Sequence, residues 1–138
     1  MGFAFTNSGK TLYLATRDGN EIVEIDTAAD TVRRRIPMAG QPGRLLLSKD
    51  EKTLIAALIG SNEVALVDVA SGKELKRAGG FARAEGMTLA PDGRSFFLAA
   101  QMDNKVHRLS LPGLEVLQTI ETKAKPDPLL VWRQKAKP

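Results

Sequence analysis

A spacing of 42 residues recurs along the chain and constrains its fold more than any other feature of the sequence. Three asparagines, Asn20, Asn62 and Asn104, fall in register at this spacing, and each is followed by a charged residue and then by Ile or Val. Two full steps of the spacing pass without an insertion or a deletion. Self-similarity with a period of about 20 to 50 residues is typical of solenoids, propellers and other arrays. The sequence therefore predicts a row of similar structural units.

Each unit contains four short runs with the composition of β-strands, separated by turn residues. In the first unit these runs cover about residues 3–6, 11–16, 21–26 and 32–37. The turn Pro91-Asp92-Gly93 has a clear mechanism, because proline presets φ and glycine accepts a positive φ. The runs are interrupted too often by Gly, Pro, Asn or Asp for a helical period to persist. Several runs, such as 45–47 and 96–100, are apolar on both faces, as a sheet packed on both sides requires.

These observations predict an all-β chain that is a fragment of a β-propeller. Four antiparallel strands form one propeller blade, and blades are repeated radially around a channel. The predicted blades cover about residues 2–43, 44–85 and 86–127, followed by an extra innermost strand at 128–132 and a basic tail at 133–138. The partial propeller thus extends over residues 1–132.

Two sequence motifs carry a resemblance to a known family. Residues 67–73 read Val-Asp-Val-Ala-Ser-Gly-Lys, and residues 90–94 read Ala-Pro-Asp-Gly-Arg before an apolar strand. These motifs resemble the repeats of YVTN-type β-propellers, and the resemblance covers residues 3 to about 132. It implies the propeller fold and a periplasmic or extracellular location. Related propellers include lactonases, quinone-associated dehydrogenase subunits and the haem-bearing domain of a nitrite reductase, so the resemblance leaves the activity open.

Three blades are fewer than the about four to eight with which propellers usually close. Each bare blade face would leave about five apolar side chains in water, a loss of about 10 kcal/mol per face. This loss is comparable with the whole stability of a typical domain. Two explanations stay open: the chain is the C-terminal part of a longer propeller, which the family resemblance favours, or two or more copies complete a ring. We expect the isolated chain to self-associate.

The composition narrows the chemistry that the chain can perform. Cysteine is absent, which excludes disulfides, thiolate metal sites and cysteine nucleophiles. His107 is the only histidine, and alone it supplies neither a metal ligand set nor a general-base relay. The net charge of +4 arises within residues 123–138, whereas residues 1–122 are balanced, which disfavours a basic nucleic-acid-binding face. We therefore expect no catalytic residue, no metal and no cofactor, and no apolar run is long enough to span a membrane.

Candidate binding residues lie where the loops between second and third strands meet the linkers between blades. On this face we single out the residues that turn chemistry does not require, and these are Arg17, Gln41, Arg44, Arg83, Glu85, Gln101 and Lys125. The three arginines suit an anionic ligand. Ordinary solvated loop residues are the alternative interpretation. By contrast, Asp26, Asp68 and Asp92 lie at strand ends and are expected to form turns.

The leading hypothesis is a non-enzymatic binding or scaffold module whose loop-rich face takes a protein or a small anion. The alternative is a fragment of a propeller enzyme or of a quinone- or haem-associated periplasmic subunit, whose site would need several His, Asp or Glu side chains on the channel. A third interpretation assigns nucleic acid to the basic run 33–35, but charge on an outer strand also protects a sheet edge from pairing. The expected partners are missing blades or further copies of the chain, rather than a membrane or nucleic acid.

Overall fold

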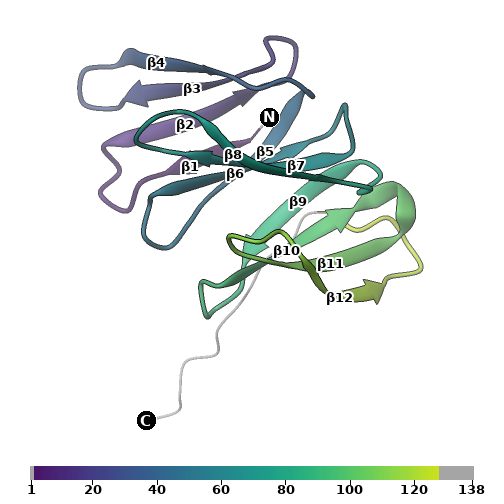
Figure 1. The fold of residues 1–138 in the computed structure, drawn as a ribbon. Coiled ribbons are helices and arrows are strands. Elements are labelled where there is room, and N and C mark those ends of the chain that lie inside the picture. The colour runs from purple at the N-terminus through teal and green to yellow at the C-terminus, as the bar shows by residue number, and fades with distance from the viewer. Residues whose placement is uncertain (1, 128–138) are drawn as a thin grey trace.

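The computed structural model describes residues 2–127, which form three antiparallel sheets of four strands each (Figure 1). Blade 1 consists of β1 (Phe3–Phe5), β2 (Thr11–Thr16), β3 (Glu21–Asp26) and β4 (Thr31–Pro37). Blade 2 consists of β5 (Pro42–Leu47), β6 (Thr53–Leu58), β7 (Glu63–Asp68) and β8 (Glu74–Gly79). Blade 3 consists of β9 (Ala84–Leu89), β10 (Ser95–Ala100), β11 (Lys105–Ser110) and β12 (Val116–Glu121), with the short 3₁₀ turn η1 (Gln101–Asp103) between β10 and β11.

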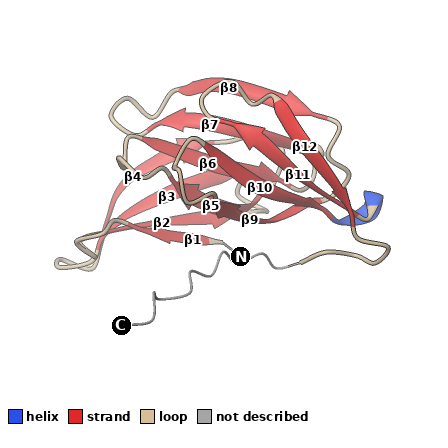
Figure 2. Cartoon of the chain, turned by 90° about the horizontal axis from the view of Figure 1, so that it is seen from below, coloured by secondary structure: helices blue, strands red, loops and turns tan. Residues whose placement is uncertain are grey.

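The strands of each blade pair in chain order, so every blade is a meander. The first strand of blade 2, β5, contacts both β1 and β9, while β4, β8 and β12 lie at the periphery (Figure 2). The register between third and fourth strands shifts at equivalent places in the three blades, at Glu24/Ile25, Leu66/Val67 and Arg108/Leu109. A shift of this kind bends a strand and increases its twist. The all-β class and the three four-stranded antiparallel sheets predicted from the sequence are confirmed.

Two apolar clusters join the blades, one at each seam between neighbouring sheets. Seam 1 lies between blades 1 and 2 and contains Tyr13 and Ile22, whereas seam 2 lies between blades 2 and 3 and contains Phe96. Strand β6 serves both seams, because the adjacent residues Leu54 and Ile55 are fully buried and belong to different clusters. Successive side chains of a strand point to opposite faces of the sheet. The runs that are apolar on both faces are therefore explained by packing on both sides.

The aspartates Asp26, Asp68 and Asp92 close turns between strands, as predicted. Each carboxylate accepts hydrogen bonds from backbone N–H groups two or three residues further along the chain, at 2.8 to 3.1 Å. The pKa of each carboxyl group is lowered. The main cause at Asp26 and Asp68 is a hydrogen bond donated to the carboxylate by a side chain, and at Asp92 it is one donated by a backbone N–H. These carboxylates are thus committed to local backbone structure.

The predicted strand boundaries differ from the observed ones by a residue at two places. The run predicted at 3–6 ends at Phe5, and the run predicted at 32–37 begins at Thr31. The innermost strand predicted at 128–132 and the basic tail at 133–138 lie outside the described residues. In the described part of the chain, no helix has the length and apolarity required to cross a membrane.

Candidate functional site

Three of the predicted arginines converge on one carboxylate near the centre of the stack. Glu85, in β9, is only 3% exposed. Its Oε1 accepts a hydrogen bond from Arg83 Nε at 3.2 Å. Its Oε2 lies 3.8 Å from Arg44 Nε and 4.0 Å from Arg17 Nη2. We call these four residues the arginine cluster.

Each arginine of the cluster is positioned by a different blade. Arg17 follows β2 of blade 1, Arg44 lies in β5 of blade 2, and Arg83 immediately precedes β9 of blade 3. The Arg17 guanidinium lies over Gly43, where an added Cβ would be 3.2 Å from Arg17 Nε. A side chain at this position would therefore crowd the guanidinium. Glycine at position 43 leaves room for the Arg17 side chain, and strand β5 contacts β9. Arg17 of blade 1 can therefore reach the Glu85 carboxylate of blade 3.

The cluster carries more positive than negative charge. Arg44 Nη2 also lies 3.6 Å from Asp127 Oδ2, so three guanidinium groups face two carboxylates. A buried carboxylate is tolerated only when it is paired, and Glu85 therefore holds the arginines together. The distance of 4.0 Å between Arg17 and Glu85 exceeds that of a hydrogen bond, so this pair interacts through charge alone. Arg17 Nε is buried and has no hydrogen-bond partner among the described residues.

An open cavity of about 590 Å³ lies beside the cluster. Its lining residues are Arg17, Gln41, Ile59, Asn62, Ala82, Arg83 and Met102. Three of them were predicted from the sequence, namely Arg17, Gln41 and Arg83. Small-molecule sites are typically concave and about 300 to 1,000 Å³, with few polar groups among apolar ones. The cavity is of this kind, because its guanidinium and amide groups lie beside Ile59 and Met102.

Two linker residues of the cavity, Gln41 and Arg83, are held in place by asparagines of the preceding blade. Gln41 and Arg83 have positive φ angles of 59° and 56°. The N–H of each donates a 2.9 Å hydrogen bond to an asparagine Oδ1, from Gln41 to Asn20 and from Arg83 to Asn62. The recurring asparagines thus fix the linkers that carry the candidate residues. Their spacing of 42 was visible in the sequence, whereas their role as acceptors for the linkers was not.

Comparison with known protein families agrees with this architecture. The model of the YNCE-like β-propeller family matches residues 3–137. The chain belongs to this family. The propeller identity that the repeats and motifs predicted is thereby confirmed.

A similar fold occurs in a solved structure. Hydrazine synthase from Kuenenia stuttgartiensis matches with a TM-score of 0.82 and 20% sequence identity. The match covers 90% of this chain and 36% of that chain. At this identity the likeness shows the fold alone. No curated protein matches the sequence.

Two predicted site residues of this YNCE-like propeller belong neither to the cluster nor to the lining of the cavity. Gln101 begins η1, and its N–H donates to the carbonyl oxygen of Arg83 at 3.2 Å, so it abuts the cavity without lining it. Lys125 is exposed and forms no ion pair with any residue in the described range 2–127. Sequence reasoning missed Asp127, although it falls 42 residues after Glu85. That spacing is the signal that could have found it.

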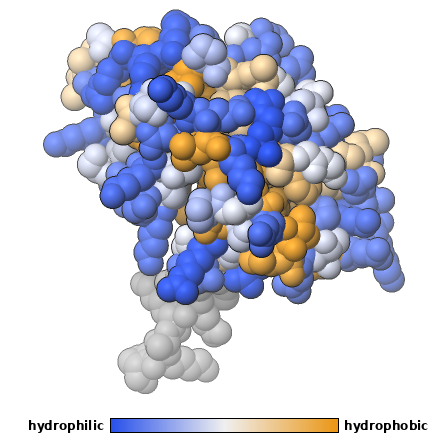
Figure 3. Space-filling view, in the orientation of Figure 1, coloured by the Kyte–Doolittle hydropathy of each residue, from blue (hydrophilic) through white to orange (hydrophobic). Residues whose placement is uncertain are grey.

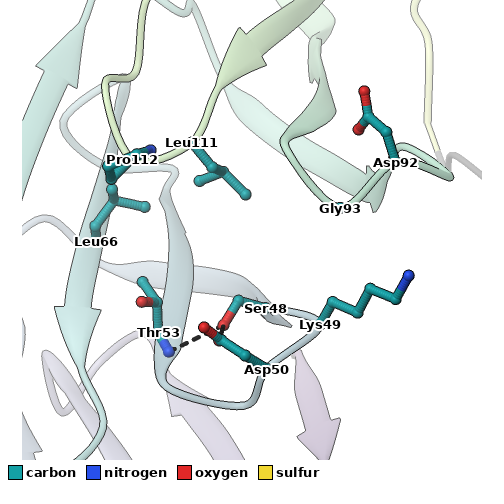
Figure 4. A pocket seen from close by; sticks show the side chains of 9 residues that line it. All are labelled: Ser48, Lys49, Asp50, Thr53, Leu66, Asp92, Gly93, Leu111 and Pro112. Carbon is teal, nitrogen blue, oxygen red and sulfur yellow. Dashed lines mark hydrogen bonds between the residues drawn. The ribbon is translucent and has the colours of Figure 1, made fainter.

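A second cavity, of about 480 Å³, opens between blades 2 and 3 near the turns from first to second strands. Figure 4 shows Leu66, Leu111 and Pro112 on one side of it and the turn bearing Asp50 on the other. The Asp50 carboxylate accepts hydrogen bonds from the Ser48 hydroxyl at 2.7 Å and from a backbone N–H, and these bonds lower its pKa. The polar groups of Asp50 and Ser48 are thus used to close the turn.

His107 packs within the blade rather than in either cavity. Its ring lies 5.4 Å from that of Phe81, and Nδ1 lies 2.9 Å from the Thr119 hydroxyl oxygen. Burial lowers the pKa of His107. Among residues 2–127, no group of three or more His, Asp or Glu side chains is placed to hold a metal ion.

Proposed function

We propose that this chain is a non-enzymatic binding module, and that its arginine cluster takes a small anionic group such as a carboxylate or phosphate. The observation that carries the proposal is the meeting of three guanidinium groups from three blades beside an open cavity. One of the three, Arg17, has a buried Nε without a partner among the described residues.

The chemistry of guanidinium groups supports an anion as the ligand. Arginine presents a rigid fork of donors that matches carboxylate and phosphate oxygens. Of the three guanidinium groups, that of Arg83 lies within ordinary hydrogen-bond distance of Glu85. Among the described residues, three guanidinium groups stand beside the two carboxylates Glu85 and Asp127. An anion entering the cavity would balance positive charge of these guanidinium groups and would accept a hydrogen bond from Arg17.

Calorimetric titration of the full chain with inorganic phosphate and with citrate tests this function. We expect saturable binding of at least one anion. We also expect Arg17→Gln to weaken that binding about tenfold or more, because a hydrogen bond to a charged group contributes about 1.5 to 3 kcal/mol. Arg17 is suited to substitution, since it makes no hydrogen bond to Glu85.

The matched control is Arg33→Gln on β4. Arg33 is also a partly exposed arginine that pairs with a carboxylate, at 2.7 Å from Asp26 Oδ2, but it lies outside the cavity lining. This variant should bind as the unchanged chain does. The absence of saturable heat for both anions, or an equal loss in the two variants, would overturn the proposal.

A further inference from the structure

The cavity of about 480 Å³ in seam 2 lies where an ion pair lies in seam 1. In seam 1 the Arg34 guanidinium donates to the Glu24 carboxylate at 2.9 Å. It also donates to the carbonyl oxygens of Val69 and Ala70, at 2.7 and 3.4 Å. The equivalents of its three partners, one repeat length later, line the cavity, and these are Leu66, Leu111 and Pro112. The two seams can therefore be compared position by position.

The arginine of seam 1 has no equivalent that fills the same space in seam 2. Lys76 is at the repeat position of Arg34, but it is exposed and does not line the cavity. Leu114 packs into seam 2 and takes part of the space of the arginine. The side chain of Leu66 is at the position of the Glu24 carboxylate. The cavity is thus the space that remains, and its floor is apolar where that of seam 1 is ionic.

The mouth of the cavity also differs from its equivalent in seam 1. There the Asn7 N–H donates a hydrogen bond to the Glu51 carboxylate, which links the turns of the two blades. The equivalent residues at seam 2 are Lys49 and Gly93. The Lys49 stem lies against Gly93, because an added Cβ there would be 3.1 Å from Lys49 Cδ. Lys49 is therefore held at the mouth by its stem while its ammonium group is left for other contacts.

The charges that line the cavity are used within the protein, except that of Lys49. The Asp50 carboxylate accepts a hydrogen bond from the Ser48 hydroxyl at 2.7 Å. The Asp92 carboxylate accepts one from Arg108 at 3.3 Å. Among residues 2–127, Lys49 forms no ion pair. Its ammonium group is thus suited to an anionic group of a ligand.

The apolar wall of the cavity is large enough for an aromatic ring. In Figure 4 the Leu111 side chain points into the space between its own turn and the turn that bears Asp50. Figure 3 shows apolar side chains at the surface where β10 to β12 lie, and Leu111 and Pro112 connect β11 with β12. An apolar cavity of about 150 Å³ takes up benzene. The cavity of seam 2 therefore has room for a ring and a substituent.

We propose that the cavity of seam 2 binds a small aromatic acid. The ring takes the place of the planar Arg34 guanidinium of seam 1, against Leu66 and Leu111, and the carboxylate pairs with the Lys49 ammonium group. This site is separate from the arginine cluster. The cavity lies at the turns from first to second strands, whereas Arg17 follows a second strand, at the other end of the blade.

Titration of the full chain with phenylacetate tests the site through the leucine methyl signals in carbon–proton correlation spectra. The signals of Leu66 and Leu111 should shift and saturate together, because a bound ring changes the magnetic field at neighbouring methyl groups. The signal of Leu75, which is 58% exposed on β8 and outside the lining, should stay in place. Shifts that do not saturate, or that are equal at Leu75, would overturn the proposal. Arg17→Gln should leave the shifts unchanged, so the outcome does not depend on the anion site.

A double variant that copies seam 1 into seam 2 tests the place of the ring. Leu66→Glu combined with Lys76→Arg should fill the cavity and abolish the shift of the Leu111 signal. The matched control is Leu75→Glu combined with Lys73→Arg, which makes the same two changes at exposed positions outside the lining. Far-ultraviolet circular dichroism verifies that the sheets of both variants are intact. An unchanged shift in the copied seam, or equal losses in the two variants, would show that the ring does not bind there.

Substitution of Lys49 tests the acid group without changing the buried floor. Lys49→Met keeps an apolar stem against Gly93 and removes the charge. It should weaken the binding of phenylacetate about fivefold, since an exposed ion pair contributes little. Benzyl alcohol, which has the ring but no charge, should bind the variant and the unchanged chain equally. Equal binding of phenylacetate to both chains would contradict the pairing with Lys49.

Discussion

The turn between β11 and β12 holds Leu114 at a φ of 56°, a conformation that leucine rarely adopts. The equivalent residue of blade 2 is Gly72, which has a φ of 72° and lies against the Arg34 guanidinium. Leu114 is 5% exposed and belongs to the apolar cluster of seam 2. Packing of the leucine side chain in seam 2 thus takes the place of the arginine that lies against the turn in seam 1.

Substitution of Leu114 separates packing from backbone strain. Removing a buried leucine side chain costs about 2 to 5 kcal/mol, while a non-glycine residue in the left-handed region costs about 1 to 2 kcal/mol. The loss of packing therefore outweighs the relief of backbone strain, and Leu114→Gly should destabilise the chain by about 1 to 3 kcal/mol. Leu114→Ala should destabilise it further, because it loses the packing and keeps the strain. Urea unfolding measures both, and a glycine variant less stable than the alanine variant would contradict this explanation.

At the scale of elements, seams 1 and 2 differ in the kind of side chain that the third strand contributes to them. In seam 1 the carboxylate of Glu24, which is 6% exposed, accepts a hydrogen bond from Arg34 Nε at 2.9 Å. The residues at these positions in blade 2 are Leu66 and Lys76, and Leu66 is buried in seam 2. An ion pair at one seam is therefore replaced by apolar packing at the next.

Breaking the ion pair of seam 1 should cost more than replacing it. Arg34→Ala removes the closest partner of the buried Glu24 carboxylate among residues 2–127, leaves the weaker contact to Arg33, and should lower the free energy of unfolding by about 3 kcal/mol. Combining Arg34→Ala with Glu24→Leu, the residue type of blade 2, should recover at least half of that loss. Thermal or urea unfolding of the three variants measures the difference. A double variant as unstable as Arg34→Ala would show that the buried charge is not the cause.

The strand pattern could be predicted because turn residues and apolar runs recur at one spacing, while the register shifts could not. The shifts occur at Glu24/Ile25, Leu66/Val67 and Arg108/Leu109, and the first residues of these pairs share neither charge nor size. They therefore leave no residue signature. Arg17 and Glu85 were both candidates, but their contact depends on the open backbone at Gly43 and on the meeting of β5 with β9.

On the scale of the whole molecule, the propeller architecture follows from the spacing of 42 and from apolar residues on both faces of the strands. On the face of blade 1 opposite to seam 1, the apolar side chains of Phe3 and Phe5 are more than half exposed. The seams are apolar, whereas the centre, where β1, β5 and β9 approach one another, carries the arginine cluster. The charged centre is therefore the place where we propose that an anion binds.

The most direct test of the anion site is a phosphate titration followed through the arginine Nε–Hε resonances in nitrogen–proton correlation spectra. We predict that the Arg17 and Arg83 signals shift together and reach saturation at one common concentration. The signal of Arg33, on the outer strand β4, should stay in place. Signals that shift linearly without saturating, or equally for all arginines, would show that phosphate only screens the surface and would contradict a binding site at the cluster.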